Sequence, residues 1–600
     1  MAPGEAGARG ATDGTFAVIG ALVAAAALAG AVGAGGALLA RAAPGLLARP
    51  AGWLWALGTG MGAHALMLSL LAAAGLLSPM TATATLVLLG MGWALRPAIR
   101  VPRPSGGYAA LVLPVLLLPA LVAALAPPTD TDELYQHLAL ARRIAEGGAL
   151  IGGFESPDGS RPQLVHAIFA GQYAVGGAIA ARLWHLGVVL ALLLGVGELG
   201  DARFGAGRGL VPAVIVATSY SFAHEAGLAY NDLPAALWLM LGVEAALSGL
   251  AAPAGLFLGL ALAAKYTAAP AAAAAGLVLL VRTPRRPHAF FMAAAAGVVP
   301  LAPWWIRNVS EGLHPLFPYA GWPAVEGFVF VYPEKYGIGH TWVDALRLPL
   351  DVLFRSRVDS FAFLGQLSWG WLALAVGALW TARKDRDARL LLAVAGAGFL
   401  GWGASAQVMR YLLPLAGVAA LAGAASSWRV LALVLGVASL PRNAAPLAEE
   451  TRDRLAVVFG AEDEEAFLHR ELPAWGALRY LRDHVPAREP VALLYSWQGY
   501  YLRQPYLLGS VEDHTPTRQW LASHGDGALH ALYERGVRWL LVGDLHFLRK
   551  SYAFLPEPEW RSQFVEPQER LRYLLRRDAE RLHASARWEV YRLDAPPSGD

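Results

Sequence analysis

The chain has 600 residues, of which 56% are hydrophobic and 16% are charged, and its formal net charge is +3. This charged fraction is far below that of a soluble domain and indicates a membrane protein, while the small net charge argues against a nucleic-acid-binding protein. The lack of cysteine excludes disulfides, thiol catalysis and cysteine-ligated metals. Long, continuously apolar runs without alternation predict a multi-spanning helical bundle rather than a β-barrel.

Taken in chain order, the apolar runs predict about fourteen transmembrane helices of roughly 20 residues each. They cover residues 16–40, 52–77, 80–95, 108–126, 184–200, 210–227, 232–249, 255–267, 268–281, 289–304, 361–381, 390–405, 411–427 and 429–441. The first run is too long for the apolar core of a signal peptide and lacks a basic leader, so we expect it to be retained as a helix.

Arginine and lysine clusters set the predicted orientation. The clusters are Arg41 and Arg49; Arg96, Arg100 and Arg103; Arg203 and Arg208; Arg282, Arg285 and Arg286; and Arg383, Lys384, Arg386 and Arg389. All of them fall on one side if the N-terminus is outside. Two long loops, 127–183 and 305–360, and the C-terminal region then lie on the external side. This predicts a multi-pass protein of the plasma (inner) membrane, with its N-terminus and C-terminal domain outside the cytoplasm.

The C-terminal region, residues 442–600, differs from the rest of the chain because its charges are frequent and its apolar runs are short. Helix-like stretches cover 475–484, 527–535 and 568–583, and strand-like stretches cover 490–495, 537–542 and 587–593. A small extracytoplasmic α/β domain is therefore predicted. It contains no Gly-x-Gly-x-x-Gly or P-loop, so nucleotide binding is not supported.

One acidic segment stands out directly after the apolar run 108–126: Pro127-Pro128-Thr129-Asp130-Thr131-Asp132-Glu133-Leu134-Tyr135-Gln136-His137. Three carboxylates within four residues cannot lie in hydrocarbon, so they mark the point where a helix leaves the bilayer. Solvated loop charges are the plain alternative. Arg142, Arg143 and a Gly147-Gly148 stop follow.

Four further polar sites lie at predicted external helix ends. They are Tyr230-Asn231-Asp232-Leu233-Pro234; Lys265-Tyr266-Thr267; Trp304-Trp305-Ile306-Arg307-Asn308 with His314-Pro315 and Phe317-Pro318 after it; and Gln407-Val408-Met409-Arg410-Tyr411-Leu412-Leu413-Pro414. Each has an ordinary alternative: a helix-starting turn, a snorkelling lysine or an interfacial tryptophan belt.

Together these five sites resemble, in the same order, the GT-C membrane glycosyltransferases, and in particular the protein mannosyltransferases and aminoarabinose transferases. The resemblance covers residues 108–441, and the C-terminal region also looks like the external domain of such proteins. It implies a GT-C-like transmembrane catalytic module there, an external α/β domain at 442–600 and extra N-terminal helices at 1–107 whose role it does not explain.

The resemblance also implies a reaction: transfer of a sugar, a hexose or pentose, from a polyprenyl phosphate to an acceptor hydroxyl on a lipid, glycan or protein at the external face. The acceptor hydroxyl needs a carboxylate base, and the departing phosphate needs positive charge. The expected catalytic residues are Asp132, Glu133 and Asp232; the phosphate-binding residues are Lys265, Arg307 and Arg410; and the substrate-binding residues are Tyr135, His137, Asn231, Tyr266, Trp304, Asn308 and Tyr411.

Two choices within this site stay open. Asp130 competes with Asp132 for the role of general base; the Asp-Glu pairing of the family favours Asp132, and Glu133 is expected to orient a partner or the loop. Some members of the superfamily hold a divalent cation such as Mg²⁺ or Mn²⁺ between such acids, but His137, His166, His224 and His340 lack ligand spacing. No obligatory metal or other cofactor is predicted.

Two other classes of function compete with the transferase. A non-catalytic transporter or flippase of lipid-linked glycans is the main alternative, although transporters usually bury charge at the midplane and show inverted repeats, which the sequence lacks. A structural membrane subunit is the other, and it leaves the Asp-Glu pair without a purpose.

Overall fold

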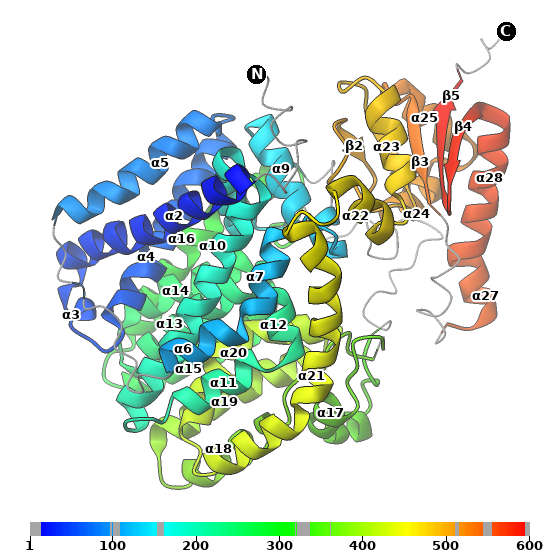
Figure 1. Ribbon diagram of the computed structural model, residues 1–600. Helices are drawn as coiled ribbons and strands as arrows, with labels where there is room; N and C mark the ends of the chain where they lie inside the picture. The colour runs from blue at the N-terminus through cyan, green and yellow to red at the C-terminus, as the bar shows by residue number, and fades with distance from the viewer. Residues whose placement is uncertain are drawn as a thin grey trace.

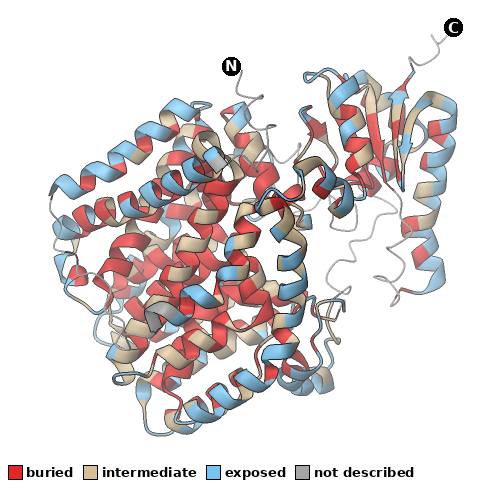
Figure 2. Cartoon of the chain, viewed as in Figure 1, coloured by how far each residue is buried: buried red, intermediate tan, exposed pale blue. Residues whose placement is uncertain are grey.

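A computed structural model describes residues 14–95, 99, 109–152, 161–317, 320, 336–360, 362–509, 515–543 and 555–594. These residues form a large bundle of helices and a small domain with a mixed β-sheet at the C-terminal end (Figure 1). Buried residues concentrate where the helices pack together, while outer helices such as α5 expose most of one side (Figure 2). The predicted fold class, a helical polytopic protein with a small α/β domain, is confirmed.

The bundle contains short and long apolar helices. They are α2 (Gly14–Ala42), α3 (Pro44–Leu47), α4 (Gly52–Ala73), α5 (Pro79–Met91), η1 (Gly92–Leu95), α6 (Ala109–Leu116), α7 (Leu118–Leu125), α8 (Thr131–Tyr135), α9 (His137–Gly147), α10 (Leu164–Phe204), α11 (Leu210–Ala217), α12 (Tyr220–Ala226), α13 (Asp232–Leu247), α14 (Ala251–Ala264), η3 (Tyr266–Ala268), α15 (Ala269–Arg282), α16 (His288–Ser310), α17 (Trp342–Phe354), α18 (Gly370–Ala382), α19 (Arg386–Gly403), η5 (Met409–Leu415), α20 (Ala416–Ala424) and α21 (Arg429–Val458).

Each predicted apolar run overlaps one of these helices or a pair of them, but the run 361–381 is helical only from Gly370, where α18 begins, and the run 184–200 is part of the longer α10. Among the described helices, five are by themselves long and apolar enough to cross a membrane: α2, α4, α10, α16 and α21. The shorter ones pair up or are packed inside the bundle. The number of crossings and their orientation therefore remain predictions.

The N-terminal helices are part of the same core as the rest of the bundle. Helix α2 packs against α4 and α10. A Cβ atom on Gly35 would lie 1.9 Å from the Ala56 carbonyl oxygen, and one on Gly60 would lie 1.8 Å from that of Ala31. Small residues thus let two apolar helices approach closely, as is common between membrane helices.

The predicted loop 127–183 is wrong in its second half, because α10 begins at Leu164 and runs for 41 residues. Polar residues and a glycine pair interrupt the apolar run there, and they suggested a loop. The helix instead accommodates them: Gly177 adopts φ 70° and kinks it, and Arg182 is buried against a carboxylate. A charge that finds its partner inside the protein can lie in a spanning helix.

The predicted boundary between residues 441 and 442 is also wrong, because it falls inside α21. Pro441 and Pro446 each remove a backbone donor, which suggested a helix end. Arg442 of the same stretch holds the helix against its neighbours, because it donates to the Leu353 carbonyl and to the Ser356 hydroxyl, each at 3.0 Å. The separate domain begins only after Val458.

The C-terminal domain contains helices on both sides of a five-stranded sheet with strand order β2-β1-β3-β5-β4. Its elements are α22 (Glu464–Glu471), α23 (Trp475–His484), β1 (Val491–Leu494), β2 (Tyr506–Leu507), α24 (Thr515–His524), η6 (Gly525–Gly527), α25 (Ala528–Glu534), β3 (Trp539–Val542), α27 (Glu557–Trp560), η7 (Arg561–Val565), α28 (Glu566–Asp578), β4 (Ala579–Ser585) and β5 (Trp588–Leu593). Strand β1 pairs in parallel with β2 and β3, while β5 pairs antiparallel with β3 and β4.

Alternating side chains of β1 serve two cores. Val491 and Leu493 join the core that includes α23, and Ala492 and Leu494 join the core that includes α25 and α28. The predicted helices 475–484 and 527–535 and all three predicted strands are confirmed within two residues. The predicted helix 568–583 is wrong at its end, because β4 begins at Ala579 and forms a hairpin with β5.

Described members of three of the basic clusters lie together at one end of the bundle. Arg208 donates there to the Ser426 carbonyl at 3.1 Å, and Arg386 to the Val281 carbonyl at 3.1 Å. The cluster of Arg96, Arg100 and Arg103 lies outside the described residues. Asp387 pairs there with both Arg203 and Arg282. At the other end the acidic segment meets the C-terminal domain, where Tyr501 donates to the Pro128 carbonyl at 2.7 Å.

Candidate active site

The acidic segment is shaped by its first carboxylate. Asp130 is the N-cap of α8, and its Oδ1 accepts the backbone N–H groups of Asp132 at 3.0 Å and Glu133 at 3.4 Å. Such a cap satisfies donors that a helix start leaves unpaired. The predicted amphipathic helix follows as α9 and ends at Gly148, whose φ of 71° suits a glycine. The sequence therefore determines the local geometry that separates the three acids.

Glu133 lies on the buried side of α8. Its carboxylate is bonded by both ends of the Arg182 guanidinium, with 2.9 Å from Nε to Oε1, and by the Ala229 N–H at 2.7 Å. The same arginine donates to the carbonyls of Ala123 and Ala126. Glu133 and Arg182 thus tie α8 to α7, α10 and the start of α13. The Glu133 side chain is fully buried and braces the loop, and its predicted catalytic role stays a prediction.

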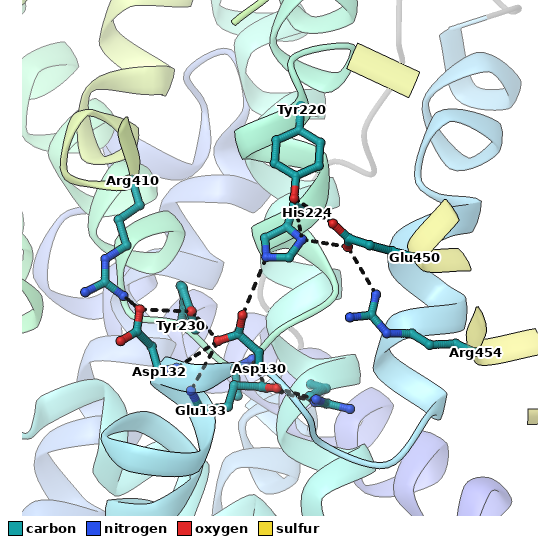
Figure 3. A network of polar contacts seen from close by, with 11 residues as sticks. Asp130, Asp132, Glu133, Tyr220, His224, Tyr230, Arg410, Glu450 and Arg454 are labelled. Atoms are coloured by element: carbon teal, nitrogen blue, oxygen red, sulfur yellow. Dashed lines mark hydrogen bonds and ion pairs between the residues drawn. The ribbon is translucent and has the colours of Figure 1, made fainter. Parts of the chain in front are cut away.

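Asp132 lies on the opposite side of α8 and is about one fifth exposed. Its Oδ2 accepts from the Arg410 guanidinium, which comes from η5, and from the Tyr230 hydroxyl at 3.3 Å (Figure 3). Tyr230 also donates to Asp130. The guanidinium lies over the ring of Tyr411 at 5.0 Å from its centroid. Three segments far apart in the sequence thus place a carboxylate, a hydroxyl and a guanidinium in contact.

A second ion pair lies beside this group. Lys265 Nζ is 2.5 Å from the fully buried carboxylate of Asp232, and it lies 4.9 Å from the centroid of the Tyr411 ring. Asn231 supports the pair because its amide donates to the Ala264 carbonyl at 2.7 Å, which holds the start of α13 against the end of α14. Asp232 therefore anchors Lys265, and the aromatic ring of Tyr411 is shared by both cations.

His137 and Tyr135 form the buried floor of the site. His137 Nδ1 lies 3.0 Å from His166 Nε2, and the His137 ring is 4.6 Å from that of Tyr230. Burial, together with the charges of His166, Lys265, Arg410 and Arg161, lowers the pKa of His137 well below its usual range. The imidazole is therefore neutral at physiological pH. Tyr135 is buried as well.

The third predicted cation belongs to a neighbouring group of side chains. Arg307 donates to the Ile151 carbonyl at 3.4 Å and approaches Glu311 at 3.8 Å. Tyr266, the residue after Lys265, accepts from the Trp305 indole at 3.1 Å. This group thus adjoins the Lys265 pair along the chain.

Two predicted substrate contacts lie beneath that group rather than on its surface. The Trp304 and Asn308 side chains are both buried, and Asn308 donates to the carbonyls of Pro315 and Phe317. They support the turn after α16, so their predicted contact with substrate is corrected to a supporting role. Pro318, part of the same predicted motif, lies outside the described residues.

The structure adds a network that the sequence did not single out. His224 of α12 lies 3.6 Å from Asp130 and 2.8 Å from Glu450 of α21 (Figure 3). Glu450 also accepts from Tyr220 at 2.6 Å and pairs with Arg454 at 3.3 Å. Burial opposes ionisation of Asp130, but the hydrogen bond and charge of His224, with the bond from Tyr230, hold the pKa of this carboxyl well below its usual range.

Only one sequence signal pointed toward this network, the spacing of Tyr220 and His224, which places them on one face of a helix. Glu450 was assigned to the external domain, so no pattern joined it to them. Glu225 was also missed, because no sequence pattern singled it out. It is buried, and its carboxyl oxygens have no hydrogen-bond partner among the described residues.

An apolar cavity of about 430 Å³ opens among the helices that carry the site. It is lined by residues of α11, α12, α17, α18, α19, η5 and α20. Leu412 and Leu413, which directly follow Arg410 and Tyr411, form part of its wall, and so does Phe222 of α12. Ser219 is the one polar side chain among the lining residues. The apolar cavity can therefore hold hydrocarbon, and its wall begins two residues after Arg410 along the chain.

Within the described part of the chain, no group of three or more His, Asp or Glu side chains is arranged to hold a metal ion. Asp130 and Asp132 are instead occupied by His224, Tyr230 and Arg410. The question of a divalent cation, left open by the sequence, remains untested.

No family model matches this sequence, and no curated protein matches it either. Among solved structures, the chain is similar to ArnT from Cupriavidus metallidurans. The structure bound to undecaprenyl phosphate is 13% identical, with 85% of this chain and 99% of that chain covered and a TM-score of 0.47. The apo structure is 15% identical, with 81% and 98% covered and a TM-score of 0.48.

The chain is also similar to the arabinofuranosyltransferase AftD from Mycobacteria. That protein is 17% identical, with 83% of this chain and 41% of that chain covered and a TM-score of 0.43. Identities and TM-scores this low do not assign an activity to this chain.

Proposed function

We propose that this chain is a membrane glycosyltransferase of the GT-C type, which moves a hexose or pentose from a polyprenyl-phosphate donor to an acceptor hydroxyl at the external face. The observation that carries the proposal is the contact between Asp132 and Arg410, because Arg410 lies in η5, whose Leu412 and Leu413 line the apolar cavity. A candidate base and a candidate phosphate-binding cation thus contact each other, and the cavity wall begins two residues further along the chain. The sequence resemblance to GT-C enzymes rests on the same residues.

The lipid carrier is argued from the cavity and the cations. Leu412, Leu413 and Phe222 offer apolar surface to a prenyl chain. Arg410 lies two residues before this cavity wall along the chain, and both Arg410 and Lys265 lie near the ring of Tyr411. A guanidinium binds phosphate oxygens in pairs, whereas an ammonium acts as a point charge. A phosphate held there would have its prenyl chain in the cavity and its sugar toward Asp132.

The proposed reaction forms one bond and breaks one. The acceptor oxygen attacks the anomeric carbon of the sugar, and the bond between that carbon and the phosphate oxygen breaks with its electron pair left on the phosphate. Asp132 takes the proton of the acceptor hydroxyl. Arg410 and Lys265 stabilise the charge that develops on the departing polyprenyl phosphate.

Because Asp132 pairs with Arg410, the donor phosphate also has the effect of freeing the candidate base. With no donor bound, the guanidinium neutralises the carboxylate. A phosphate dianion competes for the same guanidinium, and Arg410 turning toward it leaves Asp132 free to accept a proton. Asp130 is unsuited to be the base, because the α8 backbone, Tyr230 and His224 already occupy its oxygens.

The test is transfer by the purified, detergent-solubilised chain, measured with polyprenyl-phosphate sugars that carry hexose or pentose and either a long or a short prenyl chain. Asp132→Asn keeps the size of the side chain but removes the base, so turnover should fall by about 10²–10⁴-fold. Asp359→Asn is the matched control, because this acid is exposed and pairs only locally with Arg357. Long-chain donors should show the lower KM.

Full activity of Asp132→Asn would contradict the assigned base. A chain that moves intact lipid-linked sugar between the leaflets of a vesicle, without breaking the sugar–phosphate bond, would instead support a flippase.

A further inference from the structure

A second cavity lies at the far end of the bundle, where α3, the turn between α13 and α14, and the turn between α15 and α16 meet. Its volume is about 460 Å³. Helix α3 lies at the end of the bundle away from the C-terminal domain (Figure 1). The cavity is formed jointly by the N-terminal helices, whose role the sequence did not explain, and by the main module.

The lining of this cavity carries positive charge and no negative charge. Arg49, Arg286 and His288 contribute to it, and no Asp or Glu of the described residues does. Arg49 donates to the Ser248 hydroxyl at 2.8 Å. Arg286 and His288 make no side-chain hydrogen bond or ion pair within the described ranges, unlike Arg203 and Arg282, which share Asp387 at the same end.

The backbone adds to this field. Helices α14 and α16 both begin at the cavity, with Ala251 and His288 as their first residues, and neither start has a side-chain cap. Uncapped N–H groups and the helix dipole favour an anion at such a position. The two helix starts therefore add to the positive field of the cations that line the cavity.

The rim of the cavity is apolar and exposed. Ala289 and Met292 of α16 line it, and Phe291 next to them has 71% of its surface exposed. Leu38, near the end of α2, is also exposed. A ligand that suits both features has a phosphate for the cations and hydrocarbon chains for the outer surface of α16.

We propose that this cavity binds the phosphate headgroup of an anionic phospholipid, with the acyl chains along α16. The site lies at the end of the bundle opposite Asp132, and its existence does not depend on the proposed transferase reaction. With the orientation expected from the basic clusters, the lipid belongs to the cytoplasmic leaflet, whose anionic lipids are attracted by basic residues. The N-terminal helices then complete a lipid site.

The test is native mass spectrometry of the full chain in detergent, titrated with dioleoyl phosphatidylglycerol, with dioleoyl phosphatidylcholine and with inorganic phosphate. We expect one phosphatidylglycerol bound about tenfold more tightly than phosphatidylcholine. Arg286→Ala should weaken phosphatidylglycerol by about tenfold or more, as for a lost charge-assisted bond. Arg285→Ala removes the same charge from the adjacent residue, which does not line the cavity, and should leave the affinity within about twofold.

Three outcomes would overturn the proposal. Equal affinity for the two lipids would show that charge does not select the ligand. Equal effects of Arg285→Ala and Arg286→Ala would show a diffuse surface attraction. Displacement of the bound lipid by equimolar inorganic phosphate would assign the cavity to a free anion. Arg286 is exposed, so its variant should fold; the thermal unfolding midpoint of each variant verifies this.

Discussion

The two faces of α8 carry neighbouring acids, each paired with an arginine, yet the surroundings of the two pairs are opposite. On the buried face, Glu133 and Arg182 are 0% and 2% exposed and are joined by further backbone bonds. On the open face, Asp132 and Arg410 are 20% and 18% exposed, and Arg410 lies two residues before the wall of a cavity. Two neighbouring acids of one motif, Asp132 and Glu133, can therefore have different roles. Exposure separates a brace from a candidate reacting group.

The largest expected effect on folding comes from breaking the buried pair. Glu133→Ala leaves Arg182 charged and unpaired in the core, which should cost about 3–5 kcal/mol of stability. Thermal unfolding and the yield of monodisperse protein in detergent measure this loss. Asp132→Ala is the matched control on the open face and should unfold near the wild-type temperature.

A paired replacement sharpens this test. Changing Glu133→Leu together with Arg182→Met removes both charges at similar volume, and such a replacement is often neutral for stability. Recovery of stability in the double variant, compared with the Glu133→Ala variant, identifies Glu133 as a brace. A stable Glu133→Ala protein that has lost all transfer would instead return Glu133 to the reaction.

The next largest effect concerns the open pair. Arg410→Ala removes a charge-assisted partner of the phosphate, which should cost about 1.5–3 kcal/mol in kcat/KM for the donor. Arg410→Lys keeps the charge but loses paired binding of the phosphate. Its kcat/KM for the donor should therefore lie between those of Arg410→Ala and wild type. Unchanged donor turnover in both variants, with normal membrane levels, would make Arg410 an interfacial anchor only.

A smaller effect is expected at His224, which links Asp130 to Glu450. His224→Gln keeps a hydrogen-bonding side chain but removes the charge that lowers the pKa of Asp130. Because the folded-state pKa of Asp130 lies below that of an unfolded aspartate, about 3.9, its ionised form adds stability above that pH, and this stability is lost as the pH falls further. The variant should therefore unfold at a higher pH during acid titration.

Turnover of the same variant at neutral pH should fall roughly threefold to tenfold, as for the weakening of the contact that holds Asp130, which accepts from Tyr230. His530→Gln provides the control, because His530 is exposed and pairs only with Glu534 on its own helix. An acid-unfolding midpoint equal to that of wild type would show that Asp130 does not depend on His224.

Composition and periodicity determined the class of this protein and most of its helices. Long apolar runs have no stable state in water and must be helical in a bilayer, so helices such as α4 and α13 were predictable from local sequence. The strands β1 and β3 were predictable because each is a short apolar run between turn signals, and β5 because it is a short run rich in aromatic and branched residues. The acidic segment was recognisable because ionisable residues directly beside a membrane span indicate a functional site.

Tertiary structure alone decided which polar residues meet and which are hidden. The sequence placed Arg182 in a loop. In the structure it lies inside α10, where it pairs with the carboxylate of Glu133, 49 positions earlier in the chain. Glu450 lay in a segment assigned to the external domain, yet α21 carries it to His224 and thus to Asp130. Pairing and burial of charge are set by long-range contacts, and a periodic pattern contains only local spacing. The sequence could therefore identify the acidic residues, and only the packed bundle could distinguish the candidate base Asp132 from Glu133, which braces the loop.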